Sequence, residues 1–115
     1  MDSDRYVEFH FNDLLADHQQ IAEALLHACH RTHPAKVTAL LQIGDELVAV
    51  LSSVPHGGAP QDLRFELLAT YEHASLIQVL KGRWQGGYEP VGLATEPHVA
   101  VPRAFLLVQR FADEG

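Results

Sequence analysis

The chain has almost nothing from which to build a disulfide framework or a thiolate metal site. Cys29 is the single cysteine among 115 residues, so no internal disulfide can form and no CxxC pair is present. GxGxxG, GxxxxGK[ST], GxSxG and HExxH patterns are also missing, which removes the best-defined nucleotide-binding, hydrolase and zinc-protease signatures. We therefore expect no cofactor, and the sequence favours a protein that is not an enzyme.

Basic side chains are scarce, because eight Lys and Arg residues stand against fifteen Asp and Glu residues and give a net charge of −7. Such a chain repels phosphate backbones and anionic lipid surfaces. Apolar runs such as Leu47–Leu51 fall far short of the roughly 18 residues that a membrane span needs. Asp2, Asp4 and Glu8 lie where a signal peptide would be apolar. We expect a cytoplasmic protein that binds neither nucleic acid nor membrane.

The composition predicts a single folded domain over residues 1–115. Hydrophobic residues make up 47% of the chain and charged residues 20%, close to globular averages. A chain of this length can bury roughly two thirds of its unfolded surface around one core. No internal repeat, linker or low-complexity segment is visible in the sequence. The acidic surface either keeps the domain in solution or docks on a basic partner protein.

The first half of the chain predicts a strand, a helix and a hairpin. Apolar and polar residues alternate over 5–11, as in a half-buried strand. Asn12 or Asp13 can cap a helix that ends near His30 or Arg31, before Pro34. Residues 36–43 and 46–54 are rich in β-forming side chains, and the Gly44-Asp45 pair between them suits a tight turn.

The second half predicts a helix followed by two strands. Pro60 suits a first helical position and Gly82 a helix end, so we expect the helix over 60–82. Strands follow at 88–95 and 104–111, with residues 97–102 as an added edge strand or an arm. The order is β-α-β-β-α-β-β, which predicts an α+β fold with two helices on an antiparallel or mixed sheet, ferredoxin-like with an added strand.

The predicted second helix is apolar on two sides. One side carries Phe65, Leu68 and Leu76, and the other carries Leu63, Leu67, Tyr71 and Ile77. Only one side can serve the core of this domain, and an exposed apolar stripe usually marks an interface. We therefore expect a homodimer through this helix, unless the added strands or the loop around Val99–Val101 cover the stripe within the monomer.

Two polar residues lie at apolar positions of the predicted helices. His18 falls in the apolar stripe of the first helix, and Glu72 is surrounded at helical spacing by apolar residues of the second. An apolar site would shift the proton affinity of both groups, so they could form an acid–base pair in a pocket. The alternative is a structural hydrogen bond, or two side chains that reach water.

The histidines near the end of the first helix invite a metal hypothesis. His27 and His30 lie one turn apart and His33 follows, a set that zinc or nickel could use. Cys29 points to the apolar stripe instead, so the ligands do not converge on one helix. Imidazoles at a helix C-terminus, where positive charge is favourable, are the simpler interpretation. No metal site is therefore assigned.

An aromatic pair with a guanidinium flanks the Gly86-Gly87 pair. Arg83, Trp84 and Tyr88 could stack on a planar ligand or form an interface hot spot, together with Tyr71 on the second helix. Trp84 could equally cap the core where the helix ends.

Residues 80–92, LKGRWQGGYEPVG, together with 105–110, FLLVQR, resemble small bacterial domains of unknown function. In those domains a helix leads into a strand with a glycine, an aromatic residue and a glutamate, and a hydrophobic strand closes on a basic residue. The resemblance covers about residues 80–110 and implies a helix-strand-strand unit, with no activity assigned.

The function that these patterns favour is a non-enzymatic, dimeric module that binds a protein or a small ligand. The second hypothesis is a small enzyme or ligand pocket that uses His18 and Glu72. The third is a metal-binding accessory protein that uses His27, His30 and His33.

Overall fold

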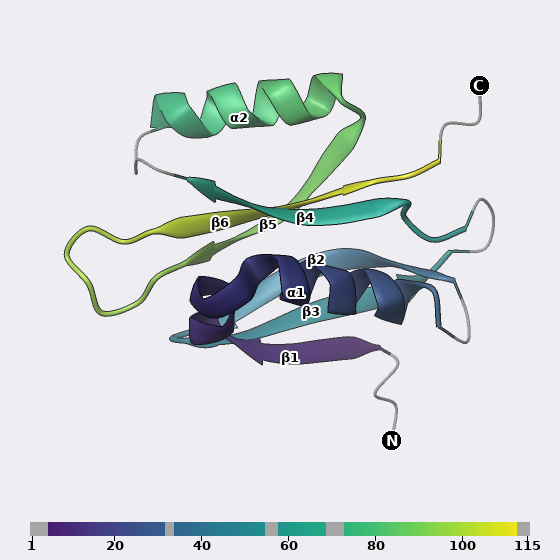
Figure 1. Ribbon diagram of the computed structural model, residues 1–115, viewed down its shortest axis with the longest axis horizontal. Coiled ribbons are helices and arrows are strands. Elements are labelled where there is room, and N and C mark those ends of the chain that lie inside the picture. The colour runs from purple at the N-terminus through teal and green to yellow at the C-terminus, as the bar shows by residue number, and fades with distance from the viewer. Residues whose placement is uncertain (1–4, 32–33, 55–57, 69–72, 113–115) are drawn as a thin grey trace.

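The computed structural model describes residues 5–31, 34–54, 58–68 and 73–112 (Figure 1). Within these ranges it confirms an α+β fold. The elements in chain order are β1 (Tyr6–His10), α1 (Phe11–Cys29), β2 (Ala35–Ile43), β3 (Glu46–Ser53), β4 (Asp62–Leu68), α2 (His73–Gln85), β5 (Tyr88–Thr95) and β6 (Ala104–Arg110).

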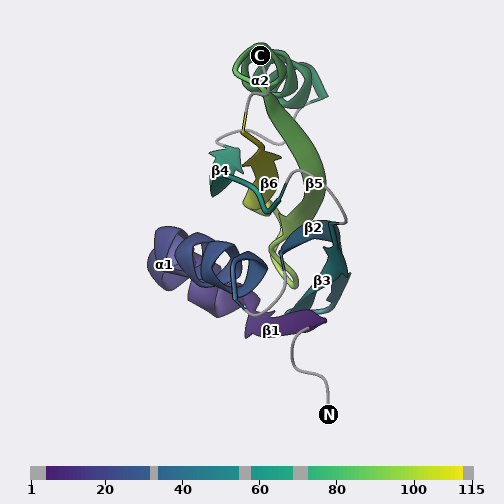
Figure 2. The ribbon, with the colours of Figure 1, turned by 90° about the vertical axis from the view of Figure 1, so that its right-hand side faces the viewer.

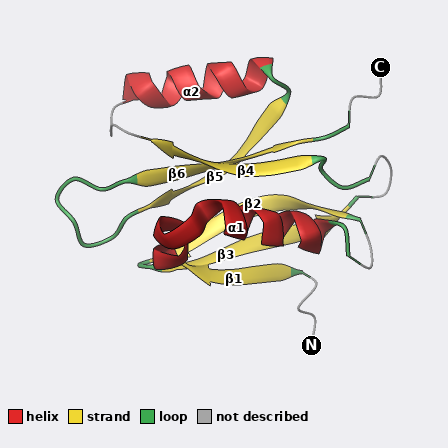
Figure 3. Cartoon of the chain, in the orientation of Figure 1, coloured by secondary structure: helices red, strands yellow, loops and turns green. Residues whose placement is uncertain are grey.

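The six strands form two separate three-stranded sheets, both antiparallel (Figure 3). The first sheet has the order β1-β3-β2 and the second the order β4-β6-β5. The predicted ferredoxin-like sheet with an added strand is therefore not confirmed. The sequence predicts that all strands share a single sheet. In the structure β4 pairs with β6 along its whole length, and these two strands form a second sheet with β5.

The predicted helix over residues 60–82 is wrong in its first part. Residues Asp62–Leu68 form β4, in which Leu63 and Phe65 are buried and Arg64 is exposed. Apolar and polar residues alternate here with the period of a strand, and this alternation outweighs the helix-start signal of Pro60. The helix α2 begins only at His73 and continues past Gly82 to Gln85.

The two halves of the chain have the same topology, a repeat that the sequence does not reveal. Each half is a β-α-β-β unit, β1-α1-β2-β3 and β4-α2-β5-β6, whose last strand lies in the middle of its sheet. A bulge interrupts β2 between Val37 and Ala39, and a bulge interrupts β5 between Pro90 and Gly92. Both bulges thus follow the third residue of the corresponding strand.

The helix α1 lies against both sheets, and α2 lies on the second sheet (Figures 1 and 2). The main core joins α1 to buried residues of both sheets, among them Leu25 of α1, Leu47 of β3 and Leu107 of β6. A smaller cluster joins Leu76, Val79 and Leu80 of α2 to the opposite face of the second sheet. The second sheet therefore lies between the two helices.

Two glutamines hold the units together through the backbone of the opposite unit. Gln109 Nε2 donates to the Val37 carbonyl over 2.8 Å, and its Oε1 accepts from the Val37 amide over 3.2 Å. Gln42 pairs in the same way with Thr95, at 2.6 and 2.9 Å. Since β2 and β5 are edge strands, each amide occupies backbone groups that the sheet leaves unpaired.

The strands β2 and β5 also approach closely where Gly92 meets Leu40. A Cβ atom at Gly92 would lie 2.8 Å from the Leu40 Cβ, so the crossing needs a residue without a side chain. Glycine is used here for close approach and not for a turn.

The predicted arm at residues 97–102 lies outside the strands, in the loop between β5 and β6. Val99 and Val101 are exposed, so this loop does not cover α2. Arg103 makes hydrogen bonds of 2.8 and 3.0 Å to both carboxylate oxygens of Glu96 and thereby closes the base of the loop. No helix in the described part of the chain is long and apolar enough to cross a membrane.

Candidate functional site

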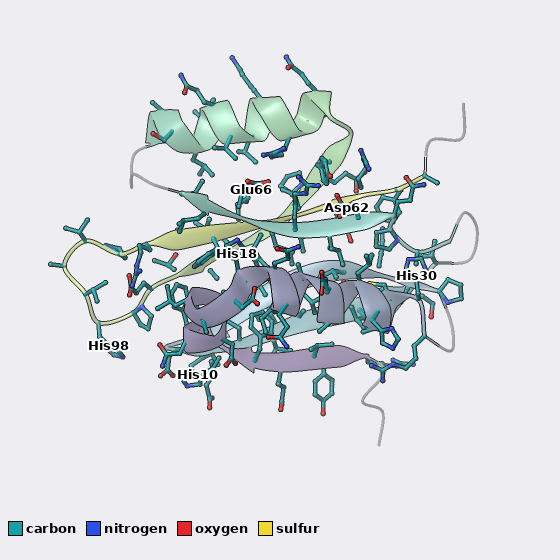
Figure 4. The ribbon with its side chains drawn as sticks, in the orientation of Figure 1. His10, His18, His30, Asp62, Glu66 and His98 are labelled. Atoms are coloured by element: carbon teal, nitrogen blue, oxygen red, sulfur yellow. The ribbon has the colours of Figure 1, made fainter. Side chains whose placement is uncertain are left out.

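A groove of about 540 Å³ runs between α1 and β4, and His18 lines it (Figure 4). Asp17 breaks the helical backbone at φ −162° and ψ 87°, and its Oδ1 accepts from the Gln20 amide over 3.2 Å. The second part of α1 thus restarts at His18 with Asp17 as its cap. The half-buried imidazole packs against Phe105, with ring centroids 5.2 Å apart.

Glu72, the predicted partner of His18, lies outside the described residues, and the acid–base pair stays a prediction. Other carboxylates line the same groove, namely Glu23, Asp62 and Glu66. Glu66 accepts from Arg83 Nε over 2.9 Å, which ties β4 to the last turn of α2.

Asp62 belongs to a polar cluster at one end of the second sheet, around the ring of Tyr88. Its carboxylate accepts a short hydrogen bond from the Tyr88 hydroxyl and one of 2.8 Å from Arg64. The guanidinium carbons of Arg64 and Arg110 each lie 5.1 Å from the centre of the Tyr88 ring, as in cation–π pairs. Although burial opposes it, these hydrogen bonds and charges lower the pKa of Asp62.

The predicted histidine set is divided between different environments. His30 Nε2 lies 2.7 Å from the Pro60 carbonyl oxygen and so connects the end of α1 to the chain entering β4. His27 is exposed, Cys29 is buried in the core, and His33 lies outside the described residues. In the parts of the chain that the structure describes, no three His, Cys, Asp or Glu side chains are grouped to hold a metal ion.

The predicted ligand or interface residues near the end of α2 point in different directions. Tyr88 is buried against α2 and held by Asp62, whereas Arg83 pairs with Glu66. Trp84 is 71% exposed and covers no core. Tyr71 lies outside the described residues.

The exposed side of α2 carries a ridge of Ile77, Lys81 and Trp84, one helical turn apart. Ile77 is 51% exposed, and a shallow groove of about 530 Å³ runs beside the ridge, lined also by Leu80 and Gln85. No Asp or Glu occurs within α2, so the α2 ridge is apolar and positive on a chain of net charge −7. Exposed tryptophan beside aliphatic side chains is typical of protein interfaces.

A second exposed apolar surface is the face of the first sheet that points away from α1. Figure 2 shows α1 on one side of β1, β3 and β2, and no described element covers the other side. The strand registers place six apolar residues on this open face, and three of them are large and exposed, Tyr6 at 42%, Leu41 at 56% and Ile43 at 84%. The full apolar set is Tyr6, Ala39, Leu41, Ile43, Val48 and Val50.

Sequence reasoning missed the open face and found only part of the α2 ridge. Residues 47–51 of β3 are all apolar, so apolar and polar residues do not alternate along this strand. Such a pattern predicts a strand that is covered on both faces. The described elements cover one face only. Leu47, Ala49 and Leu51 are buried, whereas Val48 and Val50 are half-buried. The signal that could have revealed the open face is the pair of apolar residues Val48 and Val50 on the outward side of the central strand.

No protein-family model, curated protein or solved structure matches this chain.

Proposed function

We propose that this protein is a non-enzymatic, self-associating interaction module that uses the α2 ridge as a contact surface. The exposure of Trp84 is the observation that carries the proposal. A tryptophan side chain that is 71% exposed leaves a large apolar area in water, and it lies on the same helix face as Ile77. Burial of that area against a protein is favourable by roughly 25 cal/mol per Å².

The charge of α2 supports a protein partner with acidic groups. Lys81 lies within the ridge, and the chain as a whole carries fifteen acidic residues. A second copy of the chain is therefore a partner of complementary charge. The self-association that the sequence predicts, there as a homodimer, is kept in this proposal, but it now rests on the 73–85 segment alone, because Leu63 and Leu67 belong to β4.

Sedimentation velocity between about 1 and 200 µM tests this function, and a tryptophan in a hot spot leads us to expect roughly 30-fold weaker association after Trp84→Ala. Trp84 is the single tryptophan of the chain, so its fluorescence reports on the ridge directly. We expect its emission to shift to the blue as the concentration rises. Val101→Ala, at an exposed residue of the β5–β6 loop, is the matched control and should leave association unchanged.

A wild-type chain that remains monomeric over this range would contradict the proposal. So would association that Trp84→Ala leaves unchanged.

A further inference from the structure

The two β-α-β-β units can be aligned residue by residue through their bulges. Val37 opposite Leu51 is the last pair before the bulge in the first unit, and Pro90 opposite Val108 is the last pair before the bulge in the second. Leu51 of β3 therefore corresponds to Val108 of β6, and the remaining residues of the two central strands follow in register.

This alignment shows that the two central strands present equivalent faces to their helices. Ala49 corresponds to Leu106, which packs with α2, and Ala49 is buried in the core that contains α1. The opposite, helix-free faces also correspond, with Val48 equivalent to Phe105 and Val50 to Leu107. Each unit is thus a sheet with a helix on one face and an apolar surface on the other.

Most of the helix-free face of the second sheet is buried under the first unit, although Leu67 on the same face is 50% exposed. Phe105 and Leu107 are 2% and 0% exposed, and they lie in the core that includes α1. The Phe105 ring lies 5.8 Å from that of Phe11 and 5.2 Å from that of His18, both on α1. The chain therefore demonstrates how a helix of one unit packs on the helix-free face of another.

This arrangement leaves two surfaces of a single chain without a packing partner among the described elements. The helix α1 packs on one face of the first sheet and against the second sheet, α2 packs on the other face of the second sheet, and β2 meets β5 where the two sheets adjoin (Figures 1 and 2). One surface is the open face of the first sheet, whose residues Val48 and Val50 are equivalent to the buried Phe105 and Leu107. The other surface is the α2 ridge, on the helix whose counterpart α1 contacts two sheets.

The two surfaces are complementary in charge as well as in polarity. The strand registers place the exposed Glu8 and Glu46 on the open face, beside Val48 and Ile43, with Lys36 at its far end. The α2 ridge contributes Lys81 between Ile77 and Trp84 and contains no carboxylate. Lys81 can thus meet an acidic group where the aliphatic side chains meet, while a ridge-to-ridge contact would place two lysines together.

We propose that the occupant of the open face is the α2 ridge of a second copy of this chain, so that copies associate head to tail. The proposal rests on the self-association proposed above and specifies its second surface. Such a contact is heterologous, so it closes into a ring or continues as an open chain. It repeats between molecules the sheet-helix-sheet stacking that already joins the two units within one.

A mixing experiment with two variants tests the proposal. Trp84→Ala removes the tryptophan of the ridge, and the double variant Leu41→Thr with Ile43→Thr removes exposed apolar groups of the open face while placing β-branched side chains, which suit a strand, at both positions. All three side chains are exposed, so the fold should be retained, and circular dichroism checks this. We expect each variant alone to associate roughly 30-fold more weakly than the wild type.

Mixing the two variants should restore one intact contact, because the Trp84→Ala chain keeps its open face and the double variant keeps its ridge. We expect a 1:1 complex in sedimentation with an affinity close to that of the wild-type contact. The Trp84→Ala chain contains no tryptophan, so all tryptophan emission comes from the other variant. A blue shift upon mixing therefore reports the ridge docking on the partner's open face. Leu67→Thr is the control for the double variant, because it makes the same kind of substitution at an exposed residue of β4 outside the open face. By itself it should associate as strongly as the wild type.

The failure of this inference differs from the failure of the proposed function. If Trp84→Ala abolishes association but the open-face variant associates normally, or the mixture does not form a complex, the contact is not head to tail and the inference is overturned. The self-association function then stands. If the wild type is monomeric, or associates independently of Trp84, both are overturned. Lys81→Glu serves as a second ridge variant, and unchanged association in it would overturn the charge pairing and with it the chosen orientation.

Discussion

The buried amide of Gln109 allows a quantitative test of what joins the two β-α-β-β units. Its side chain is 4% exposed and makes two hydrogen bonds with the backbone of Val37, on the edge of the other unit's sheet. Gln109→Leu keeps much of the side-chain volume but leaves the Val37 amide and carbonyl without these partners. An unsatisfied buried group costs about 1–3 kcal/mol, and the apolar leucine offsets part of the loss. We expect the free energy of unfolding to fall by about 2–4 kcal/mol.

Urea unfolding followed by circular dichroism measures this change, with the midpoint lowered and the slope unchanged. Gln42→Leu removes the equivalent pair of bonds to Thr95 at a half-buried position, where water can replace them, and should cost less than half as much. Gln20→Leu, on the exposed surface of α1, is the control and should change stability by less than about 0.5 kcal/mol. If Gln109→Leu were as stable as the Gln20 control, the amide would not be what secures the interface.

Three further results are expected. Gly92→Ala should lose about 1–3 kcal/mol in urea unfolding, because its Cβ would lie 2.8 Å from that of Leu40, whereas Gly82→Ala in α2 meets nothing within 4 Å and should gain up to about 1 kcal/mol; equal effects would refute the close approach. Burial raises the pKa of Cys29 from 9.0 to about 11. The stabilising contribution of the neutral thiol is therefore complete below pH 9 and is lost as the pH rises to about 11. The urea midpoint of the wild type should fall over this pH range, and that of Cys29→Ala should fall less. The lowered pKa of Asp62 means that its contribution is present above its ordinary value of 3.8 and is lost as the pH falls below it, so Asp62→Asn should show a smaller loss of stability between pH 6 and pH 3 than the wild type does.

Elements with a strong local pattern were predictable from the sequence. The hairpin around Gly44 agrees with β2 and β3 to within one residue at each end, and Gly44 has the positive φ of 60° that its turn requires. The strands predicted at 88–95 and 104–111 correspond to β5 and β6. These segments have clear periodicity and turn residues, so their conformation depends little on distant partners.

The segment that forms β4 was assigned wrongly because its local signals conflict. Pro60 and Asp62 are typical of a helix start, while Leu63, Arg64 and Phe65 alternate as in a strand. Pairing with β6, whose residues lie 36 to 48 positions later in the chain than their partners, decides between the two. Such long-range pairing leaves no mark in a local window.

The candidate sites show the same division. Trp84 was recognisable as an interface residue from its type and position, but its exposure depends on how α2 lies on the second sheet. Tyr88, four residues later, has the same aromatic character, yet it is enclosed by Asp62 and two arginines. Local sequence cannot distinguish these fates, because the partners come from β4 and β6.

By itself, the sequence determined that this is a small acidic α+β chain, because composition and short-range periodicity are local properties. Only the tertiary structure decided that the chain is two β-α-β-β units stacked on each other, since strand pairing and helix packing join residues far apart in sequence. The same packing decides which apolar sheet face is buried and which is open. It buries most of the helix-free face of the second sheet, whereas no described element covers that of the first, although both faces carry apolar residues.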